Sequence, residues 1–180
     1  AERADRHALY EKSVQSPDVD VRFLRKTYRR NFGEAPSVLR EDFCGTAVLS
    51  CHHVKNHKDN TAVGVDLDRP TLDWGIQHNV ETLLDREQQR RLKLIEKNVL
   101  DVTSPKVDCV LALNFSYGVF KTRAELGAYI KTVYKSLKPG GVFYMDALGG
   151  PDVMQEKTDV TEKEVAKPKK SFVFGGHSFF

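Results

Sequence analysis

The chain has 180 residues, of which 29% are charged and 40% are hydrophobic, and its formal net charge is +3. This composition predicts one soluble globular domain with a sizeable core, and it excludes a disordered chain. The small net charge does not require a nucleic-acid or membrane partner, and no apolar run reaches the roughly eighteen residues of a membrane span. Three cysteines without a disulfide framework favour a reducing compartment, so we expect a cytoplasmic protein.

The N-terminal part predicts two helices, over residues 8–15 and 18–31. Val21, Leu24 and Tyr28 form the apolar stripe of the second helix. Its solvent side carries five cations, which are Arg22, Arg25, Lys26, Arg29 and Arg30. These cations form either a surface for an anionic substrate or a solvated face near a helix C-terminus, where positive charge is favoured.

Residues 37–47 contain the pattern around which the chain is organised. An apolar, β-favouring start leads to Glu41, a small-residue turn around Gly45 follows, and a helical pattern begins at Ala47. This order is typical of the first strand, turn and helix of a nucleotide-binding α/β fold. Backbone N–H groups at such a turn can bind a ligand, and the acid adds an acceptor for a hydroxyl or ammonium group.

Three further strands are predicted, over residues 61–66, 92–96 and 107–113. Asp66 ends the first of these and lies 21 positions after Gly45, a spacing at which an acid can bind ribose hydroxyls. Asp101 and Asn114 follow the other two strands. Ligands bind at the carboxyl edge of open α/β sheets, so we expect a site where these polar residues gather.

Thr122 and Glu125 form a capping box at the start of another predicted helix. Its expected buried stripe consists of Leu126, Ile130, Val133 and Leu137. The Pro-Gly-Gly sequence at residues 139–141 ends the helical region, and a fifth strand is predicted over residues 142–145. Asp146 follows it and either faces a substrate or caps the strand end.

The composition changes after the fifth predicted strand. Residues 155–170 are rich in charge and have little periodicity, which predicts a mobile loop that is either a lid or an exposed insertion. An apolar strand starts at Ser171, and the chain ends soon afterwards. We therefore expect the C-terminal strands of the sheet to be incomplete.

The order of these motifs, over residues 37–147, resembles a class I S-adenosylmethionine-dependent methyltransferase. Glu41 matches the acid that opens the glycine-rich motif of that family. Gly45 keeps the middle glycine, whereas Phe43 and Ala47 replace the outer two. The hexapeptide Glu-Asp-Phe-Cys-Gly-Thr resembles a variant found in an uncharacterised branch of these enzymes, and the Leu-Lys-Pro-Gly-Gly sequence resembles their turn before the fifth strand.

The resemblance implies a Rossmann-like, doubly wound α/β fold whose sheet is mostly parallel, with helices on both faces. It also implies that residues 37–180 form the S-adenosylmethionine-binding domain. Residues 1–36 are then an N-terminal helical segment that covers the cofactor pocket. Within this segment, Tyr10 either contacts the cofactor or substrate or packs as a half-buried tyrosine.

S-Adenosylmethionine is the implied cofactor, and S-adenosylhomocysteine is the implied product. Asp66 would hold the ribose, Leu67 would pack on the adenine, and Asp101 with the backbone of Val102 would bind the adenine edge. The implied cofactor-binding residues are Tyr10, Glu41, Phe43, Cys44, Gly45, Thr46, Asp66, Leu67, Asp101, Val102 and Asn114.

The candidates for catalysis are Asn114 and Tyr117, and the sequence identifies no catalytic base. The Asn-Phe-Ser-Tyr sequence resembles the Asn-Pro-Pro-Tyr loop of amide and adenine-amine methyltransferases, although both prolines are replaced. Alternatively, Asn114 lines the methionine end of the cofactor and Tyr117 packs. We expect direct in-line transfer to an unidentified acceptor, with a small molecule favoured over RNA or protein.

Other functions are also compatible with the sequence. A non-catalytic methyltransferase-like binding module is one, and an NAD-dependent oxidoreductase is another, although the Gly-x-Gly-x-x-Gly turn of the latter is missing. Cys51, His52, His53 and His57 suggest a metal site, but no second ligand cluster follows, and we expect none. Cys44 is either a nucleophile or, as we expect, a small packed residue.

Overall fold

The computed structural model describes residues 5–147, 149, 158–166 and 170–177. The chain forms two compact units, one of residues 17–146 and one that combines residues 1–16 with 147–180. The second predicted helix therefore belongs with the sheet, whereas the sequence predicted a single N-terminal segment over residues 1–36. That this segment covers a pocket stays a prediction.

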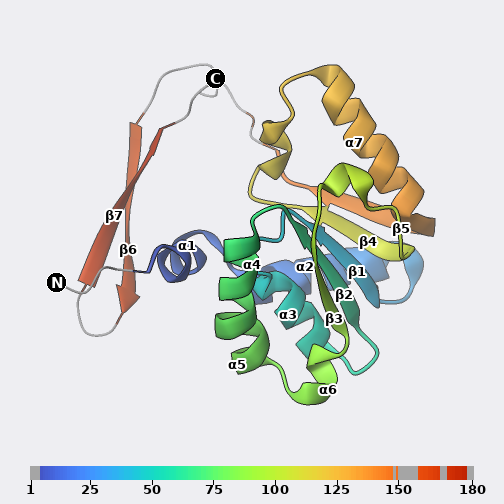
Figure 1. Cartoon of the computed structure of the whole chain (residues 1–180), viewed down its shortest axis with the longest axis horizontal. Coiled ribbons are helices and arrows are strands. Elements are labelled where there is room, and N and C mark those ends of the chain that lie inside the picture. Colours follow the sequence, from blue (N-terminus) through green and yellow to red (C-terminus); the bar gives the residue numbers. More distant parts are fainter. Residues whose placement is uncertain (1–4, 148, 150–157, 167–169, 178–180) are drawn as a thin grey trace. The chain divides into compact units, whose positions relative to one another are not determined.

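The larger unit contains a five-stranded, all-parallel sheet in the order β3-β2-β1-β4-β5 (Figure 1). Its strands are β1 Val38–Asp42, β2 Thr61–Asp66, β3 Leu92–Glu96, β4 Val107–Ala112 and β5 Leu137–Met145. The strand order reverses between β1 and β4, and this reversal creates the switch point at which open α/β sheets bind ligands. The predicted α/β, Rossmann-like fold is confirmed.

Helices cover both faces of this sheet. Helix α2, Pro17–Phe32, and helix α3, Val48–Asn56, share a core with one face, whereas α7, Arg123–Ser136, packs on the other. The shorter elements are α4 Arg69–Gly75, η1 Ile76–Val80, α5 Glu81–Leu83, α6 Arg86–Gln89, η2 Val99–Asp101 and η3 Ser116–Val119. The predicted stripe of Val21, Leu24 and Tyr28 is buried.

The buried face of α7 agrees in part with the predicted stripe, because Val133 is buried and Leu126 and Leu137 pack against the core. The structure buries Tyr129, Val133 and Ser136, and it leaves Ile130 45% exposed. Burial of Tyr129 and Ser136 follows from hydrogen bonds that their hydroxyls make beneath the helix. The apolar pattern therefore located three of its four residues at the core, but it missed Tyr129 and Ser136, whose hydroxyl-bearing side chains also face it.

Strand β5 begins at Leu137, five residues before the predicted strand over residues 142–145. The Pro-Gly-Gly sequence lies inside it, and Gly140 has a φ of 78° that favours glycine. The pairing of β4 with β5 shifts register between Val107 and Cys109, so the extra residues of β5 form an irregularity rather than a separate turn.

The smaller unit contains α1, Arg6–Val14, and an antiparallel pair of strands, β6 Thr158–Ala166 and β7 Lys170–His177. The Asp5 carboxylate caps α1 by accepting hydrogen bonds from two backbone N–H groups of its first turn. The sequence predicted a mobile loop over residues 155–170, but the structure has strand β6 at the centre of this range. The rest of that predicted loop lies largely outside the described residues.

Candidate cofactor-binding site

The turn that follows β1 keeps a glycine-like backbone without the outer glycines. Phe43, Gly45 and Ala47 have φ values of 57°, 52° and 56°, all in the left-handed region. A residue with a side chain in this region is strained by about 1–3 kcal/mol unless its surroundings hold it there. The two positions at which glycine is replaced thus keep a left-handed backbone conformation that glycine adopts readily.

The side chains of this turn point into the protein. The ring of Phe43 packs against the rings of Phe120 and Tyr129, with centroids 6.1 and 5.8 Å apart. Cys44 is 2% exposed, and a side chain at Gly64 would collide with its Sγ atom at 2.9 Å. Burial raises the pKa of the Cys44 thiol well above its ordinary value. A protonated, buried thiol is a packing group and a poor nucleophile.

Helix α4 and the π-helical stretch η1 close on the same turn. A Cβ atom at Gly75 would lie 2.4 Å from the carbonyl oxygen of Thr46, so only glycine allows this approach. The same carbonyl accepts a hydrogen bond of 3.0 Å from Nδ2 of the buried Asn79. Sequence reasoning missed Asn79, which lies in the π-helical stretch η1 and reaches the turn only in the folded protein.

Asp66 connects the end of β2 to the turn. Its Oδ2 atom accepts a hydrogen bond from the N–H of Gly45 at 2.8 Å, and its Oδ1 atom accepts one from the N–H of Asp68 at 2.9 Å. Each carboxylate oxygen can accept a second bond, so Asp66 retains acceptor capacity for hydroxyl groups. The neighbouring Leu67 side chain is 66% exposed and offers an apolar surface beside that acceptor.

The backbone at Val102 is held from inside the protein. Its carbonyl oxygen accepts hydrogen bonds from Nη1 of Arg40 at 2.5 Å and from Oγ of Ser136 at 3.1 Å. Asp101, the last residue of η2, is exposed next to it. The two residues predicted to bind adenine therefore lie together, with one exposed and the other anchored to the core.

Arg40 is fully buried in β1, and its partners form a polar network under α7. Its Nη2 atom lies 2.9 Å from Oδ2 of Asp42, which also accepts a hydrogen bond of 2.8 Å from the Tyr129 hydroxyl. Both members of the ion pair have no exposed side-chain surface. Sequence reasoning missed this network, because an arginine within a short strand resembles a surface residue.

Glu41 lies on the α3 side of β1 and is 8% exposed. Its Oε2 atom accepts hydrogen bonds from the backbone N–H of Ser50 at 3.0 Å and from the Ser50 hydroxyl at 2.5 Å. Burial raises the pKa of Glu41 to about 7, and the Ser50 hydrogen bonds only partly oppose this rise. Glu41 therefore changes charge close to neutral pH.

The loop after β4 has two consecutive residues in the left-handed region, Asn114 and Phe115, each with a φ of 56°. Their N–H groups both donate to the Asp146 carboxylate, at 2.7 and 2.9 Å. Asp146, at the end of β5, therefore holds the loop after the neighbouring strand β4, and a substrate-facing role for it stays a prediction. Tyr117 follows in η3, so both catalytic candidates lie in a segment that Asp146 holds.

Four carboxylates interact at the carboxyl edge of the sheet, namely those of Asp20, Glu41, Asp66 and Asp146. The negative charges of Asp66 and Asp20 favour protonation of Glu41. Burial raises the pKa of Asp20, and the charge of Asp146 adds to this rise. Sequence reasoning missed Asp20, which comes from the first turn of α2. This negative edge suits a cationic ligand and disfavours a pyrophosphate group.

The histidines after the turn make contacts unrelated to a metal. Nε2 of the buried His53 lies 3.1 Å from the Ser37 carbonyl oxygen, and burial lowers its pKa to about 4. His52 pairs with Asp18 at 2.7 Å. Within the described ranges, no three His, Cys, Asp or Glu side chains gather as metal ligands. The helices of these ranges also include none that is long and apolar enough to cross a membrane.

Tyr10 belongs to α1, in the smaller unit, and its side chain is 43% exposed. The other predicted cofactor-binding residues all belong to the larger unit. Cofactor contact by Tyr10 stays a prediction.

No model of a known protein family matches the chain, and no curated protein matches it in sequence. Solved structures do match its fold. The sugar N-methyltransferase KedS8 from Streptoalloteichus has a TM-score of 0.66 and 20% identity, over 91% of this chain and 62% of KedS8. DesVI from Streptomyces venezuelae has a TM-score of 0.68 and 21% identity, over 90% of this chain and 67% of DesVI.

A third match is CalS10 from Micromonospora echinaspora, an amino pentose methyltransferase whose structure holds S-adenosylmethionine. Its TM-score is 0.68 at 17% identity, over 91% of this chain and 67% of CalS10. The chain thus spans about two thirds of the length of these proteins. It has the fold of class I S-adenosylmethionine-dependent methyltransferases.

Proposed function

We propose that this protein is a methyltransferase that uses S-adenosylmethionine to methylate an amine on a small molecule. The observation that carries the proposal is the combination of a glycine-like turn at the switch point with four interacting carboxylates. Two proteins of similar fold, KedS8 and CalS10, are described as methyltransferases of a sugar nitrogen and of an amino pentose. An amino sugar is therefore the first acceptor to test.

The residues at the edge suit the parts of such a cofactor. Asp66 would accept hydrogen bonds from ribose hydroxyls, Leu67 would cover the adenine, and Glu41 would face the positive amino-acid end. When bound, the cofactor supplies a sulfonium whose methyl carbon is electrophilic. The loop that carries Asn114 and Tyr117 would orient the acceptor amine in line with that carbon, and the protein would act mainly by positioning and electrostatics.

Replacement of Asp66 by alanine is expected to weaken S-adenosylmethionine binding at least about tenfold, because charged hydrogen bonds to the ribose are lost. Isothermal titration calorimetry measures this effect. Asp59→Ala is the matched control, since it removes an exposed carboxylate just before β2, at the opposite edge, and should leave affinity unchanged. Equal affinity of the wild type and Asp66→Ala would contradict the assigned ribose site.

Titration of NADH into the same chain tests the alternative of an NAD-dependent oxidoreductase. We expect no binding of NADH, because the four carboxylates repel its pyrophosphate group. A folded chain that binds neither compound would support the alternative of a binding module. A chain that binds S-adenosylmethionine but does not transfer labelled methyl groups to amino sugars would retain the cofactor assignment and reject this acceptor class.

Asp146→Ala is expected to free the loop that carries the catalytic candidates. The N–H groups of Asn114 and Phe115 would lose their shared acceptor, and their left-handed conformations would lose support. Hydrogen exchange at these two amides should become about tenfold faster or more, while exchange in β1 and α3 stays unchanged. Unchanged exchange at both amides would show that the carboxylate does not order the loop.

A further inference from the structure

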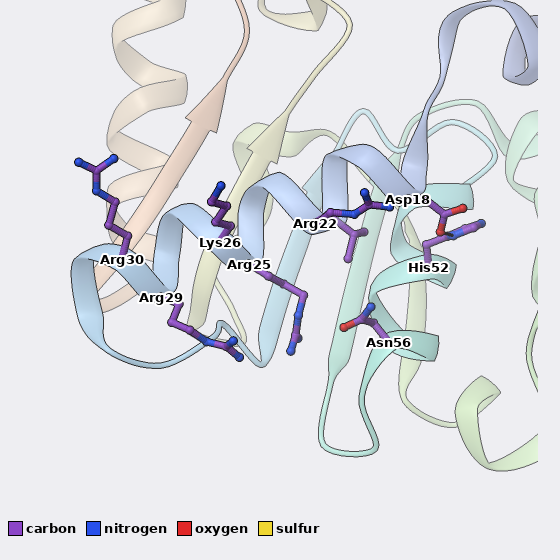
Figure 2. Close-up of a pocket in the computed structure, with 9 residues that line it drawn as sticks. Asp18, Arg22, Arg25, Lys26, Arg29, Arg30, His52 and Asn56 are labelled. Atoms are coloured by element: carbon purple, nitrogen blue, oxygen red, sulfur yellow. Dashed lines mark hydrogen bonds and ion pairs between the residues drawn. The ribbon is translucent and has the colours of Figure 1, made fainter.

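A groove of about 520 Å³ lies between α2 and α3, apart from the proposed methyl-transfer residues. The five cations of α2 line it, together with His52 and Asn56 of α3. Figure 2 shows Arg25 and Arg29 extending from α2 on the side of Asn56, whereas Lys26 and Arg30 extend from the other side of the helix. Arg22 lies nearer to Asp18 and His52.

The positive charge of this groove is not compensated within the described part of the chain. Asp18 is the carboxylate in the lining, and it pairs with His52 rather than with an arginine. None of the five cations forms an ion pair with a described residue, whereas Arg69 and Arg91 elsewhere do. Burial lowers the pKa of Arg25, and the neighbouring charge of Arg29 adds to this effect. An anion bound here would relieve that repulsion.

The arrangement of the cations suits an extended anion. Arg22, Arg25 and Arg29 recur three and four residues apart, so they span about 10 Å at about 1.5 Å per residue. Each phosphate of a nucleic-acid strand carries one negative charge, so this row of cations can contact several successive phosphates of an extended strand. The described lining includes no phenylalanine, tyrosine or tryptophan on which bases could stack. Contacts in this groove would therefore be made to the phosphodiester backbone.

We propose that the groove between α2 and α3 binds the phosphodiester backbone of a single-stranded nucleic acid. Contacts to the backbone position a strand without reading its sequence. The groove begins near the first turn of α2, the turn whose Asp20 interacts with Glu41 and Asp146. A strand in the groove would therefore have one end close to the carboxyl edge. The proposal does not depend on the proposed methyl transfer, because binding is measured without cofactor.

Fluorescence anisotropy tests the proposal with the whole chain and a labelled uridine homopolymer of about twelve nucleotides. We expect a dissociation constant in the micromolar range that weakens steeply between about 50 and 200 mM salt. The triple variant Arg22→Gln, Arg25→Gln, Arg29→Gln should bind at least tenfold more weakly. Its slope of log affinity against log salt should fall by about 2, since each contact with a single strand contributes about 0.7.

Two control variants test whether the loss of binding depends on the charge of α2. One keeps the charge at these positions, and the other removes an equal charge from α7. The triple variant with lysine at the same three positions keeps the charge and should bind like the wild type within a few-fold. Three exposed cations of α7 provide the second control, in which Arg123→Gln, Lys131→Gln and Lys135→Gln remove equal charge elsewhere. This control should retain the affinity and salt dependence of the wild type except for a small general effect of net charge.

Several outcomes would overturn the proposal. These are absence of binding by the wild type at about 50 mM salt, equal losses in the α2 and α7 glutamine variants, and complete displacement of the strand by micromolar pyrophosphate. The last result would identify a site for a compact anion. A thymidine homopolymer of the same length tests whether the groove binds DNA as well as RNA. Binding equal to that of the uridine strand indicates contact with the shared backbone, and weaker binding indicates a preference for RNA; both results support the proposal.

Discussion

Asp42→Ala is expected to lower the free energy of unfolding by about 3–5 kcal/mol, because it leaves the Arg40 guanidinium buried without its counter-charge. Both side chains are fully buried, and they lie 2.9 Å apart. The Tyr129 hydroxyl would also lose its acceptor, which adds an unsatisfied polar group to the core. Urea unfolding followed by circular dichroism measures the change, at constant pH.

A surface ion pair provides the control for this experiment. Asp73 pairs with Arg69 at 2.7 Å, but its side chain is 46% exposed, and Asp73→Ala should cost less than about 1 kcal/mol. The double variant Arg40→Met, Asp42→Leu should recover much of the lost stability, since it removes both charges together. If Asp42→Ala were no more destabilising than Asp73→Ala, Arg40 would not be held as described.

The same network links stability to the proposed cofactor site. Arg40 donates to the carbonyl oxygen of Val102, and Ser136 donates to the same atom. A change at Asp42 would alter the position of the guanidinium and hence of the backbone that is expected to face adenine. Loss of stability and loss of S-adenosylmethionine affinity should therefore occur together in Asp42→Ala, whereas Asp66→Ala leaves no buried charge unpaired and should cost less stability.

Much of the sheet could be predicted, because its strands are short apolar runs that end at polar residues. The third strand was predicted over residues 92–96, and the structure has it at Leu92–Glu96. The turn around Gly45 was located for the same reason, since one glycine and a following helix indicate a change of direction. Such local patterns specify where a strand ends and so specify the edge at which the site lies.

The buried polar contacts could not be predicted from local patterns. Arg40 contacts residues 62 and 96 positions away, and nothing near it in the sequence indicates these partners. Asn79, buried in the π-helical stretch η1, donates to the carbonyl oxygen of Thr46, 33 positions earlier. Asp20 joins the carboxyl edge because α2 packs across the sheet. In each case the three-dimensional arrangement, rather than the residue's own neighbours, determines its role.

Glu41→Gln is expected to be more stable than the wild type at high pH, and the difference in the free energy of unfolding should grow as the pH rises. The pKa of Glu41 is about 7 in the folded protein, against an ordinary value of 4.5 for a glutamate in water, so folding favours the protonated form. The contribution of protonated Glu41 to stability is thus fully present below pH 4.5 and is lost as the pH rises through 7, by up to about 3 kcal/mol. Glutamine mimics the protonated acid and should remove this loss, as urea unfolding at several pH values would show.

The charge of Glu41 should have the opposite effect on binding. S-Adenosylmethionine is positively charged, so its affinity should rise as Glu41 ionises between about pH 6 and 8, and binding at pH 7 should release protons. Calorimetry in buffers of different ionisation enthalpy measures that release. Glu41→Gln should abolish the pH dependence, whereas Glu81→Gln, an exposed glutamate on α5, should retain it. Affinity independent of pH in the wild type would show that Glu41 does not face the positive end of the cofactor.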